Sequence, residues 1–205
     1  MKKISILNYG LGNIRSLYNS INRVSGNVSL YTEKKNDNFD ILFIPGVGSF
    51  AKAMQLIKEN EFYSIIKKAK KDEKIVIGIC LGMHLLFQQG TENGLNNGLD
   101  FIDGTVNILY DGKNFKLPNI GWKKIQVIEN CELNFMKNFN NKKFYFVHSY
   151  AASPKNIEDI CTKTKYKEIE FVSMVRKKNV IGMQFHPEKS GDIGLDLIKN
   201  IINYF

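Results

Sequence analysis

Cysteine is scarce in this chain, and its spacing excludes several kinds of protein. The 205 residues include only three cysteines, Cys80, Cys131 and Cys161, which form no CxxC pair and no even disulfide set. This usage is typical of a reducing compartment, with at most one reactive thiol, and it disfavours a metal site built from thiolates. The sequence therefore predicts a protein without disulfides, without a metal site and without a cofactor.

Long apolar segments are also missing. No run approaches the ~20 residues that a helix needs to cross a bilayer. The opening segment, Met1 to Asn8, becomes polar too early for a signal peptide. We therefore expect a cytoplasmic protein with no membrane association.

Acidic residues are outnumbered, since 29 Lys and Arg against 20 Asp and Glu give a net charge of +9. A basic balance can serve nucleic acid, a membrane surface or an acidic partner. Here the lysines lie in short scattered runs, such as Lys67-Lys68 and Lys123-Lys124, rather than in one block with aromatic residues. The pattern favours solvated helix ends or a partner-facing patch, and we expect no nucleic-acid binding.

The chain does have the balance of an ordinary globular protein, with 43% hydrophobic and 24% charged residues. No repeat, low-complexity tract or linker divides it, so residues 1–205 are expected to form a single domain. A chain of this length buries enough surface to hold a core without a disulfide or metal.

The first half alternates short β-branched runs with helix-like stretches, which is the order of an α/β protein. We expect strands over 3–8, 28–31, 40–44 and 75–79, and helices over 14–24 and 51–72, the second helix broken or in two short pieces. This order predicts a mostly parallel central sheet flanked by helices on both faces.

The second half changes to successive strand candidates, which predicts an added antiparallel part. The candidates are 105–109, 125–128, 144–147, 169–176 and 180–184. The chain closes with Gly191-Asp192 as a helix start and an amphipathic helix over 193–204, whose apolar positions share one face.

The sharpest local signal is Gly78-Ile79-Cys80-Leu81-Gly82, between a predicted strand and the helix-like segment 83–87. A nucleophile on a tight strand-to-helix turn has strained backbone geometry, and glycines two residues to either side remove Cβ atoms that would clash there. The turn exposes the sulfur and aims the backbone N–H of Leu81 at a developing oxyanion, while the helix N-terminus favours a thiolate. The alternative is a small cysteine buried in a Gly-rich packing corner.

A thiolate that performs acyl transfer needs an acid and base beside it, and the chain has three histidines. His186-Pro187-Glu188 follows a predicted apolar strand, so His186 emerges at a strand end and Glu188 can hold its other ring nitrogen. Taken alone, the tripeptide is also typical of a turn. His84 lies one helical turn after Cys80, and His148 sits in an aromatic strand where a packed, satisfied histidine is the plain alternative.

Two glycine-containing segments follow predicted strands. Pro45-Gly46-Val47-Gly48-Ser49 has no following Gly-Lys-Ser/Thr, so an oxyanion donor is a better use for it than a phosphate loop. Asn8-Tyr9-Gly10-Leu11-Gly12-Asn13 offers only the start of a dinucleotide fingerprint, because the third glycine is missing.

Together these segments resemble a known family, the class I, or triad-type, glutamine amidotransferases. Pro45 to Gly48 looks like the family's oxyanion strand, Gly78 to Gly82 like its nucleophile elbow, and His186 to Glu188 like the rest of its triad. Further segments are similar to the subfamily of glutaminase subunits of imidazole glycerol phosphate synthase: Asn8 to Ser16, Leu117 to Trp122, Tyr145 to Tyr150, and His186 to Ser190.

The resemblance implies hydrolysis of glutamine to glutamate and ammonia, with Cys80 as nucleophile and His186, oriented by Glu188, as acid and base. The ammonia would pass through a barrel-shaped cyclase subunit, bound as a heterodimer, in histidine biosynthesis. By the same resemblance the remaining roles are N–H donors to the oxyanion (Val47, Gly48, Leu81), contacts to glutamine (Gly46, His84, Ser149, Tyr150) and contacts to the partner subunit (Asn13, Tyr145, Lys189).

One residue departs from the family pattern, which usually has glutamine where this chain has His84. An imidazole still offers a donor and an acceptor, but it titrates near pH 6.5. Weaker glutamine binding below that pH is therefore predicted.

Three other interpretations stay open at this point. The first is a paralogous subunit that supplies ammonia to a synthase that aminates a sugar, to which the His84 departure gives some weight. The second is a Cys-His-Glu hydrolase of the related peptidase-like type, and the third is a binding module with an inactive elbow.

Overall fold

The computed structural model describes residues 1–32, 38–110 and 116–205 of the chain. The α-helices are α1 (Ile14–Ser25), α2 (Phe50–Glu59), α3 (Phe62–Lys71), α4 (Leu81–Leu85) and α5 (Gly191–Tyr204), and 3-10 turns occur at η1 (Asn134–Phe139), η2 (Ile157–Asp159) and η3 (Pro187–Lys189). The strands are β1 (Ile4–Leu7), β2 (Val28–Tyr31), β3 (Ile41–Ile44), β4 (Ile75–Ile79), β5 (Phe87–Gly90), β6 (Asn96–Asn97), β7 (Ile102–Ile108), β8 (Asn119–Val127), β9 (Lys143–His148), β10 (Tyr150–Pro154), β11 (Ile160–Tyr166), β12 (Ile169–Lys177) and β13 (Val180–Met183).

A nine-stranded sheet with the order β2-β1-β3-β4-β13-β12-β11-β8-β9 forms the centre of the molecule. The first five strands in that order are parallel, and the last four are antiparallel to their neighbours. The carboxyl ends of β3, β4 and β13 therefore meet at one edge, which is where open parallel sheets place their sites.

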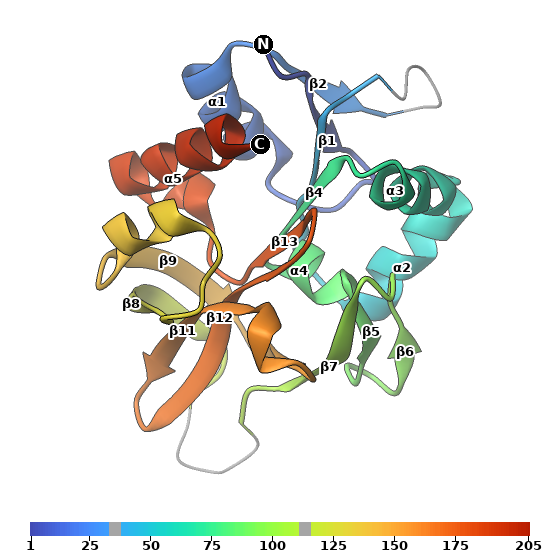
Figure 1. The fold of residues 1–205 in the computed structure, drawn as a ribbon. Helices are drawn as coiled ribbons and strands as arrows, with labels where there is room; N and C mark the ends of the chain where they lie inside the picture. Colours follow the sequence, from blue (N-terminus) through green and yellow to red (C-terminus); the bar gives the residue numbers. More distant parts are fainter. Residues whose placement is uncertain (33–37, 111–115) are drawn as a thin grey trace.

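Helices cover both faces of the parallel half (Figure 1). Alternate residues of each strand point to opposite faces, so Ile4, Ile6 and Phe43 pack with α1 and α5, while Leu42 and Ile44 pack with α2 and α3. Both faces are apolar, which explains why these strands read as continuous hydrophobic runs rather than as alternating ones.

The antiparallel half curls back toward the carboxyl edge of the parallel half. Strand β9 pairs with β8 at the far end of the sheet, yet Tyr145 of β9 also forms a bridge with His186, where the His186 N–H donates to the Tyr145 carbonyl at 2.9 Å. This return brings the end of β9 beside the segments that follow β4 and β13.

A second, four-stranded sheet has the order β10-β7-β5-β6. Strands β5 and β7 are parallel, and the other two pairs are antiparallel.

Within the described ranges, no helix is both long and apolar enough to cross a membrane.

The fold class predicted from the sequence is confirmed, with three corrections of detail. The helix expected over 83–87 is the single turn α4, which ends at Leu85, and Phe87 already begins β5. Strands β5, β6, β10 and β11 were not predicted, because they are short or polar on one face. The segment 180–184 was grouped with the antiparallel part, but β13 pairs parallel with β4 and antiparallel with β12, so it joins the two halves.

Candidate active site

Cys80 lies on a sharp turn between β4 and α4. Its φ of 53° and ψ of −109° are a strained conformation for a non-glycine residue, and its backbone N–H is held by the Met183 carbonyl at 2.7 Å. A Cβ added at Gly78 would overlap the Gly82 carbonyl, and one added at Gly82 would overlap the Ile44 carbonyl. The glycines flanking Cys80 are therefore required by packing, as the sequence predicts.

The segment after β13 brings a histidine and a carboxylate to the same edge. His186 Nδ1 and Glu188 Oε1 are 2.8 Å apart, and both side chains are almost fully buried. His186 Nε2 and Glu188 Oε2 are also buried and make no hydrogen bond. The imidazole therefore has one nitrogen fixed by a carboxylate and the other free for a reacting group.

The charge state of His186 follows from these neighbours. Burial lowers its pKa, but interactions first with Cys80 and then with Glu188 outweigh burial and raise the pKa to about 10. The interaction with Cys80 means that the sulfur and the imidazole lie close together, although the two residues are 106 positions apart in the sequence. The three residues that the sequence predicts as a triad thus occupy one neighbourhood.

A cavity of about 260 Å³ opens on the sulfur. Its lining includes most of the residues predicted to contact an oxyanion or substrate, together with Glu92, Val147 and His148; the predicted residues are Val47, Gly48, Leu81, His84, Ser149 and Tyr150. Gly46 does not line it. A Cβ at Gly46 would press on the Tyr9 hydroxyl, Leu81 and Gly82, so Gly46 serves the packing beneath the cavity.

Glu92 was missed by the sequence analysis. Its carboxylate accepts a hydrogen bond from the backbone N–H of Phe50, at the start of α2, at 2.7 Å and also lines the cavity. It lies beyond β5, which no pattern predicted, so no sequence signal pointed to it.

Tyr9 supports the segment between β3 and α2. Its hydroxyl is buried and donates to the Pro45 carbonyl at 2.7 Å. Burial, with the nearby charge of Cys80, raises the pKa of Tyr9, so the hydroxyl stays a donor. Beyond Pro45, Val47 is 42% exposed and Gly48 has a φ of 105°, which favours glycine.

His148 is a packed histidine with both ring nitrogens hydrogen-bonded, which is the non-catalytic alternative given in the sequence analysis. Nδ1 donates to the Tyr150 carbonyl at 2.8 Å, and Nε2 lies 2.9 Å from the Asn119 amide nitrogen. Its ring packs against Phe171, with centroids 4.9 Å apart. Burial lowers the pKa of His148 to about 3, so the ring is neutral and holds the corner between β9 and β10.

His84 lines the cavity, but its predicted titration near pH 6.5 is wrong. The ring is buried, and this burial lowers the pKa of His84 to about 4. Nε2 lies 2.7 Å from the Oε1 atom of Gln184. Glutamine binding is therefore not expected to weaken through His84 as the pH falls below 6.5.

Two of the three residues predicted to contact a partner share one surface. Lys189 Nζ lies over the Tyr145 ring, 6.0 Å from its centroid, and the Trp122 ring packs edge-on against Tyr145 at 6.2 Å. Trp122 and Ile120 project from one face of β8 and are 52% and 55% exposed. Asn13 precedes α1, which contacts η3, the turn that carries Lys189.

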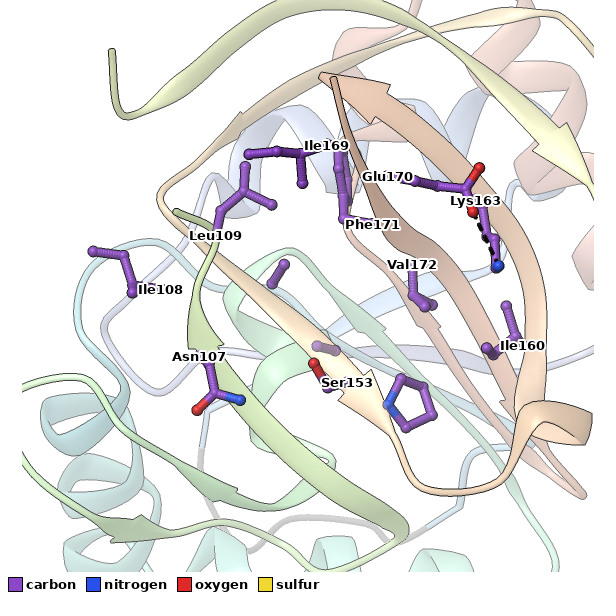
Figure 2. Close-up of a pocket in the computed structure, with 13 residues that line it drawn as sticks. Asn107, Ile108, Leu109, Ser153, Ile160, Lys163, Ile169, Glu170, Phe171 and Val172 are labelled. Carbon is purple, nitrogen blue, oxygen red and sulfur yellow. Dashed lines mark hydrogen bonds and ion pairs between the residues drawn. The ribbon is translucent and has the colours of Figure 1, made fainter. Parts of the chain in front are cut away.

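A separate cavity of about 300 Å³ lies between β7 and β10 on one side and β11 and β12 on the other (Figure 2). Aliphatic side chains line most of it, and its charged pair, Lys163 and Glu170 at 3.0 Å, is more than a third exposed. Of the residues predicted for catalysis, Cys80 lines the cavity of about 260 Å³, and none of them lines this second cavity. Across residues 1–32, 38–110 and 116–205, no group of three His, Cys, Asp or Glu side chains is placed to hold a metal ion.

The sequence matches known proteins over nearly its whole length. The family model for glutamine amidotransferase class-I matches residues 6–202. The imidazole glycerol phosphate synthase subunit HisH of Thermotoga maritima is 38% identical over 205 residues, which cover 98% of this chain and 96% of that protein. HisH of Saccharolobus solfataricus is 35% identical over 201 residues, with 97% and 96% covered.

A longer relative and two solved structures complete the comparison. The chloroplastic imidazole glycerol phosphate synthase hisHF of Arabidopsis thaliana is 36% identical over 203 residues, which cover 98% of this chain but 34% of that protein. A crystal structure of a glutamine amidotransferase and the structure of PurLQS from Thermotoga maritima both superpose with a TM-score of 0.74, at 15% and 17% identity. Each covers at least 98% of this chain and 99% of the compared chain, which shows a shared fold. By the family model and these full-length matches, the chain belongs to the class-I glutamine amidotransferases, within the family of imidazole glycerol phosphate synthase HisH subunits.

Proposed function

We propose that this chain hydrolyses glutamine to glutamate and ammonia, and that it supplies the ammonia to a barrel-type cyclase subunit of imidazole glycerol phosphate synthase. The observation that carries the proposal is the strained Cys80 elbow beside the buried His186–Glu188 pair, at the foot of a cavity large enough for one amino acid. The family membership of the chain supports the same activity.

The chemistry is acyl transfer from nitrogen to sulfur and then to water. The Cys80 thiolate attacks the carboxamide carbon of glutamine, and His186 gives its Nε2 proton to the nitrogen as the C–N bond breaks, so that ammonia leaves. Water then attacks the thioester and gives a proton to His186, the C–S bond breaks, and glutamate is released. Glu188 holds Nδ1 at 2.8 Å, which keeps Nε2 directed at the reacting atoms.

The lining of the cavity suits an amino acid with a free α-ammonium and α-carboxylate. Glu92 offers a carboxylate to the ammonium group, and Ser149 and Tyr150, at the turn between β9 and β10, offer hydroxyl and backbone N–H donors to the carboxylate. Val47, Gly48 and the first N–H of α4, on Leu81, surround the place where the oxyanion develops. One such donor is worth about 3 to 4 kcal/mol of barrier.

Transfer of ammonia to a partner follows from the chemistry and from the relatives. Ammonia released into neutral water becomes ammonium and loses its nucleophilicity, so a protected path to its acceptor is needed. The Arabidopsis relative combines a segment similar to this chain with a portion about twice as long that this chain does not match. The HisH relatives are named as subunits of imidazole glycerol phosphate synthase, and we infer from this that a partner subunit uses the ammonia and docks over Asn13, Tyr145 and Lys189.

Labelling with a glutamine-mimicking diazoketone, followed by peptide mass analysis, tests the proposal. We expect modification at Cys80, faster when the cyclase subunit and its ligand are present, and release of glutamate and ammonia from glutamine by the complex. Cys80→Ser should abolish both, whereas Cys131→Ser, a matched change at a second buried cysteine, should leave both intact.

Other outcomes would point elsewhere. Label on Cys131 or Cys161 with Cys80 unmodified contradicts the proposed nucleophile. Peptide cleavage without glutamine turnover favours the peptidase-like alternative. Recovery of the chain in a complex with a sugar-aminating synthase, in place of a cyclase, contradicts the proposed partner.

A further inference from the structure

Gln184 is a buried amide beside the proposed nucleophile that the mechanism does not use. Strands β13 and β4 pair in parallel with Met183 opposite Ile79, so the next residues along, Gln184 and Cys80, are neighbours at the sheet edge. Gln184 is fully buried, and its backbone N–H donates to the Ser173 carbonyl at 2.9 Å. The chain bends at Gln184 and Phe185 before it reaches His186.

The side chain of Gln184 connects the sulfur with His84. Its Nε2 atom lies 3.9 Å from Cys80 Sγ, at the outer limit of a hydrogen bond to sulfur, and its Oε1 atom lies 2.7 Å from His84 Nε2. His84 is one helical turn after Cys80, and its backbone N–H donates to the Cys80 carbonyl at 3.2 Å. Cys80, Gln184 and His84 are therefore connected in a ring of three contacts. The ends of β4 and β13 and the single turn α4 hold the three residues in place.

The orientation of this amide depends on one proton. Burial lowers the pKa of His84 to about 4, so at neutral pH the ring carries a single N–H. The Gln184 carbonyl oxygen can only accept, so that proton must be on His84 Nε2. The amide then presents its N–H group, and not its oxygen, to the sulfur. The reverse orientation would set a carbonyl lone pair against the thiolate.

We propose that His84 is a positioning residue: as the Nε2–H tautomer it fixes the Gln184 amide, which in turn donates a hydrogen bond to the Cys80 thiolate. Gln184 is then the group that contacts the reacting atom, and His84 acts through it. This inference rests on the proposed function only in taking Cys80 as the nucleophile. It gives His84 a role that differs from the substrate contact implied by the family resemblance.

The other titratable groups around Cys80 come from four segments of the chain. They are Tyr9 after β1, His148 at the end of β9, and His186 and Glu188 after β13, with Glu92 across the cavity. His186 is the main partner of the sulfur, so the Gln184 donor adds to that interaction and does not replace it.

The tautomer of His84 can be measured on the unaltered protein by ¹⁵N NMR of its imidazole nitrogens. With only three histidines in the chain, the assignment is tractable. We expect His84 to be the neutral Nε2–H form between about pH 5.5 and 8, with His148 as an internal contrast, since its Nδ1 donates to the Tyr150 carbonyl. An Nδ1–H tautomer at His84 would overturn the proposal.

Alkylation of Cys80 by iodoacetamide, assigned by peptide mass analysis, tests the effect on the sulfur. His84→Phe and Gln184→Leu should each slow alkylation near pH 6 by about 3- to 10-fold, the size expected for one hydrogen bond. His84→Gln, which restores an amide donor, should return the rate to within about 2-fold, as a rescue by one donor predicts. In the Gln184→Leu background, His84→Phe should add less than about 2-fold, because the two residues act in series.

Two outcomes contradict the inference: a Gln184→Leu rate equal to that of the unaltered chain, or effects of the two substitutions that multiply independently. If His84→Phe fails to fold, the tautomer measurement decides alone. Because alkylation needs no glutamine, a chain with these reactivities that hydrolyses no glutamine contradicts the proposed function and leaves the inference standing. If the chain hydrolyses glutamine but its alkylation rate is unchanged by both substitutions, the inference is contradicted and the proposed function stands.

Discussion

The three histidines lie in one region, yet their surroundings give them different charge states. His84 and His148 are buried without a carboxylate, and burial lowers their pKa values to about 4 and about 3. His186 is also buried, but Cys80 and Glu188 raise its pKa to about 10. Cys80 and, after it, Glu188 thus set the proposed acid apart from the two neutral rings.

These shifts predict that the fold loses stability as the pH falls below 6.5. The unfolded chain binds protons at His84 and His148 from about pH 6.5 downward while the folded chain does not, so each contributes a slope approaching 1.4 kcal/mol per pH unit. The contribution of the two neutral rings to the free energy of unfolding is present above pH 6.5. It is lost as the pH falls toward the lowered pKa values. Urea unfolding between about pH 5 and 6.5 measures this slope.

His148→Phe should reduce that slope by about half, since it removes one of two equal contributors. His186→Gln is the control, because a raised pKa contributes stability that is complete by about pH 5.5, so that His186 adds no slope below that pH. An unchanged slope in His148→Phe would show that the ring is protonated in the folded state.

The sequence predicted Cys80, His186 and Glu188 as a catalytic triad, because each sits in a short motif whose chemistry is local. Gln184 and Glu92 have no such motif. Gln184 matters only because β13 pairs with β4 in a register that places it beside Cys80. Glu92 matters only because the segment after β5 reaches the start of α2, where the Phe50 N–H donates to it. Pairings between distant segments are what a single sequence does not reveal.

The segment from Pro45 to Gly48 depends on a contact from another element. The turn after β1 supplies Tyr9, whose hydroxyl donates to the Pro45 carbonyl at 2.7 Å, and Gly46 has no Cβ at the place that this hydroxyl fills. The first turn of the chain therefore fixes the start of the proposed oxyanion segment.

Removing that hydroxyl with Tyr9→Phe should lower kcat for glutamine by about 10-fold with a change in KM below about 2-fold, the pattern for loss of transition-state stabilisation. The buried Pro45 carbonyl loses its donor, which costs about 1 to 3 kcal/mol of folding free energy. Steady-state kinetics and thermal unfolding measure the two effects. Tyr18→Phe on α1 removes a hydroxyl away from the cavity and should change neither; a Tyr9→Phe enzyme with unaltered kcat would contradict the assigned role.

Elements were predictable where one physical requirement dominates. The parallel strands β3 and β4 are buried on both faces, and β4 was predicted with the bounds that the structure gives and β3 within one residue. The edge strand β2 is half exposed, and it was also predicted with its observed bounds. Strand β10 has no alternation of polar and apolar residues in its sequence, and buried hydroxyls such as Thr162 and Thr164, which bond Ser173, disguise the core face of β11. In β10 and β11, pairing with distant strands decides the structure, and the local sequence pattern does not.

The molecule as a whole presents one aromatic surface beside the cavity. Trp122 and Ile120 on β8 are more than half exposed, and Trp122 packs on Tyr145, over which Lys189 lies. Exposed aromatic side chains next to a cation are typical of interface anchors. The same strand, β9, continues from Tyr145 to Val147, whose carbonyl is 3.7 Å from Cys80 Sγ, so a partner docked on this surface contacts the strand that borders the nucleophile.

Trp122→Ala should therefore weaken binding of the cyclase subunit by at least about 30-fold, which is the loss expected for an aromatic anchor. The rate at which Cys80 is alkylated in the chain without its partner should stay unchanged. The physical reason is that the indole is 52% exposed although it packs on Tyr145, and it gains the rest of its burial only from a partner. Isothermal titration of the two subunits measures the affinity. Ile157→Ala, which truncates a side chain that is 72% exposed on η2, is the matched control and should bind normally; equal affinities for both variants would move the docking site away from β8 and β9.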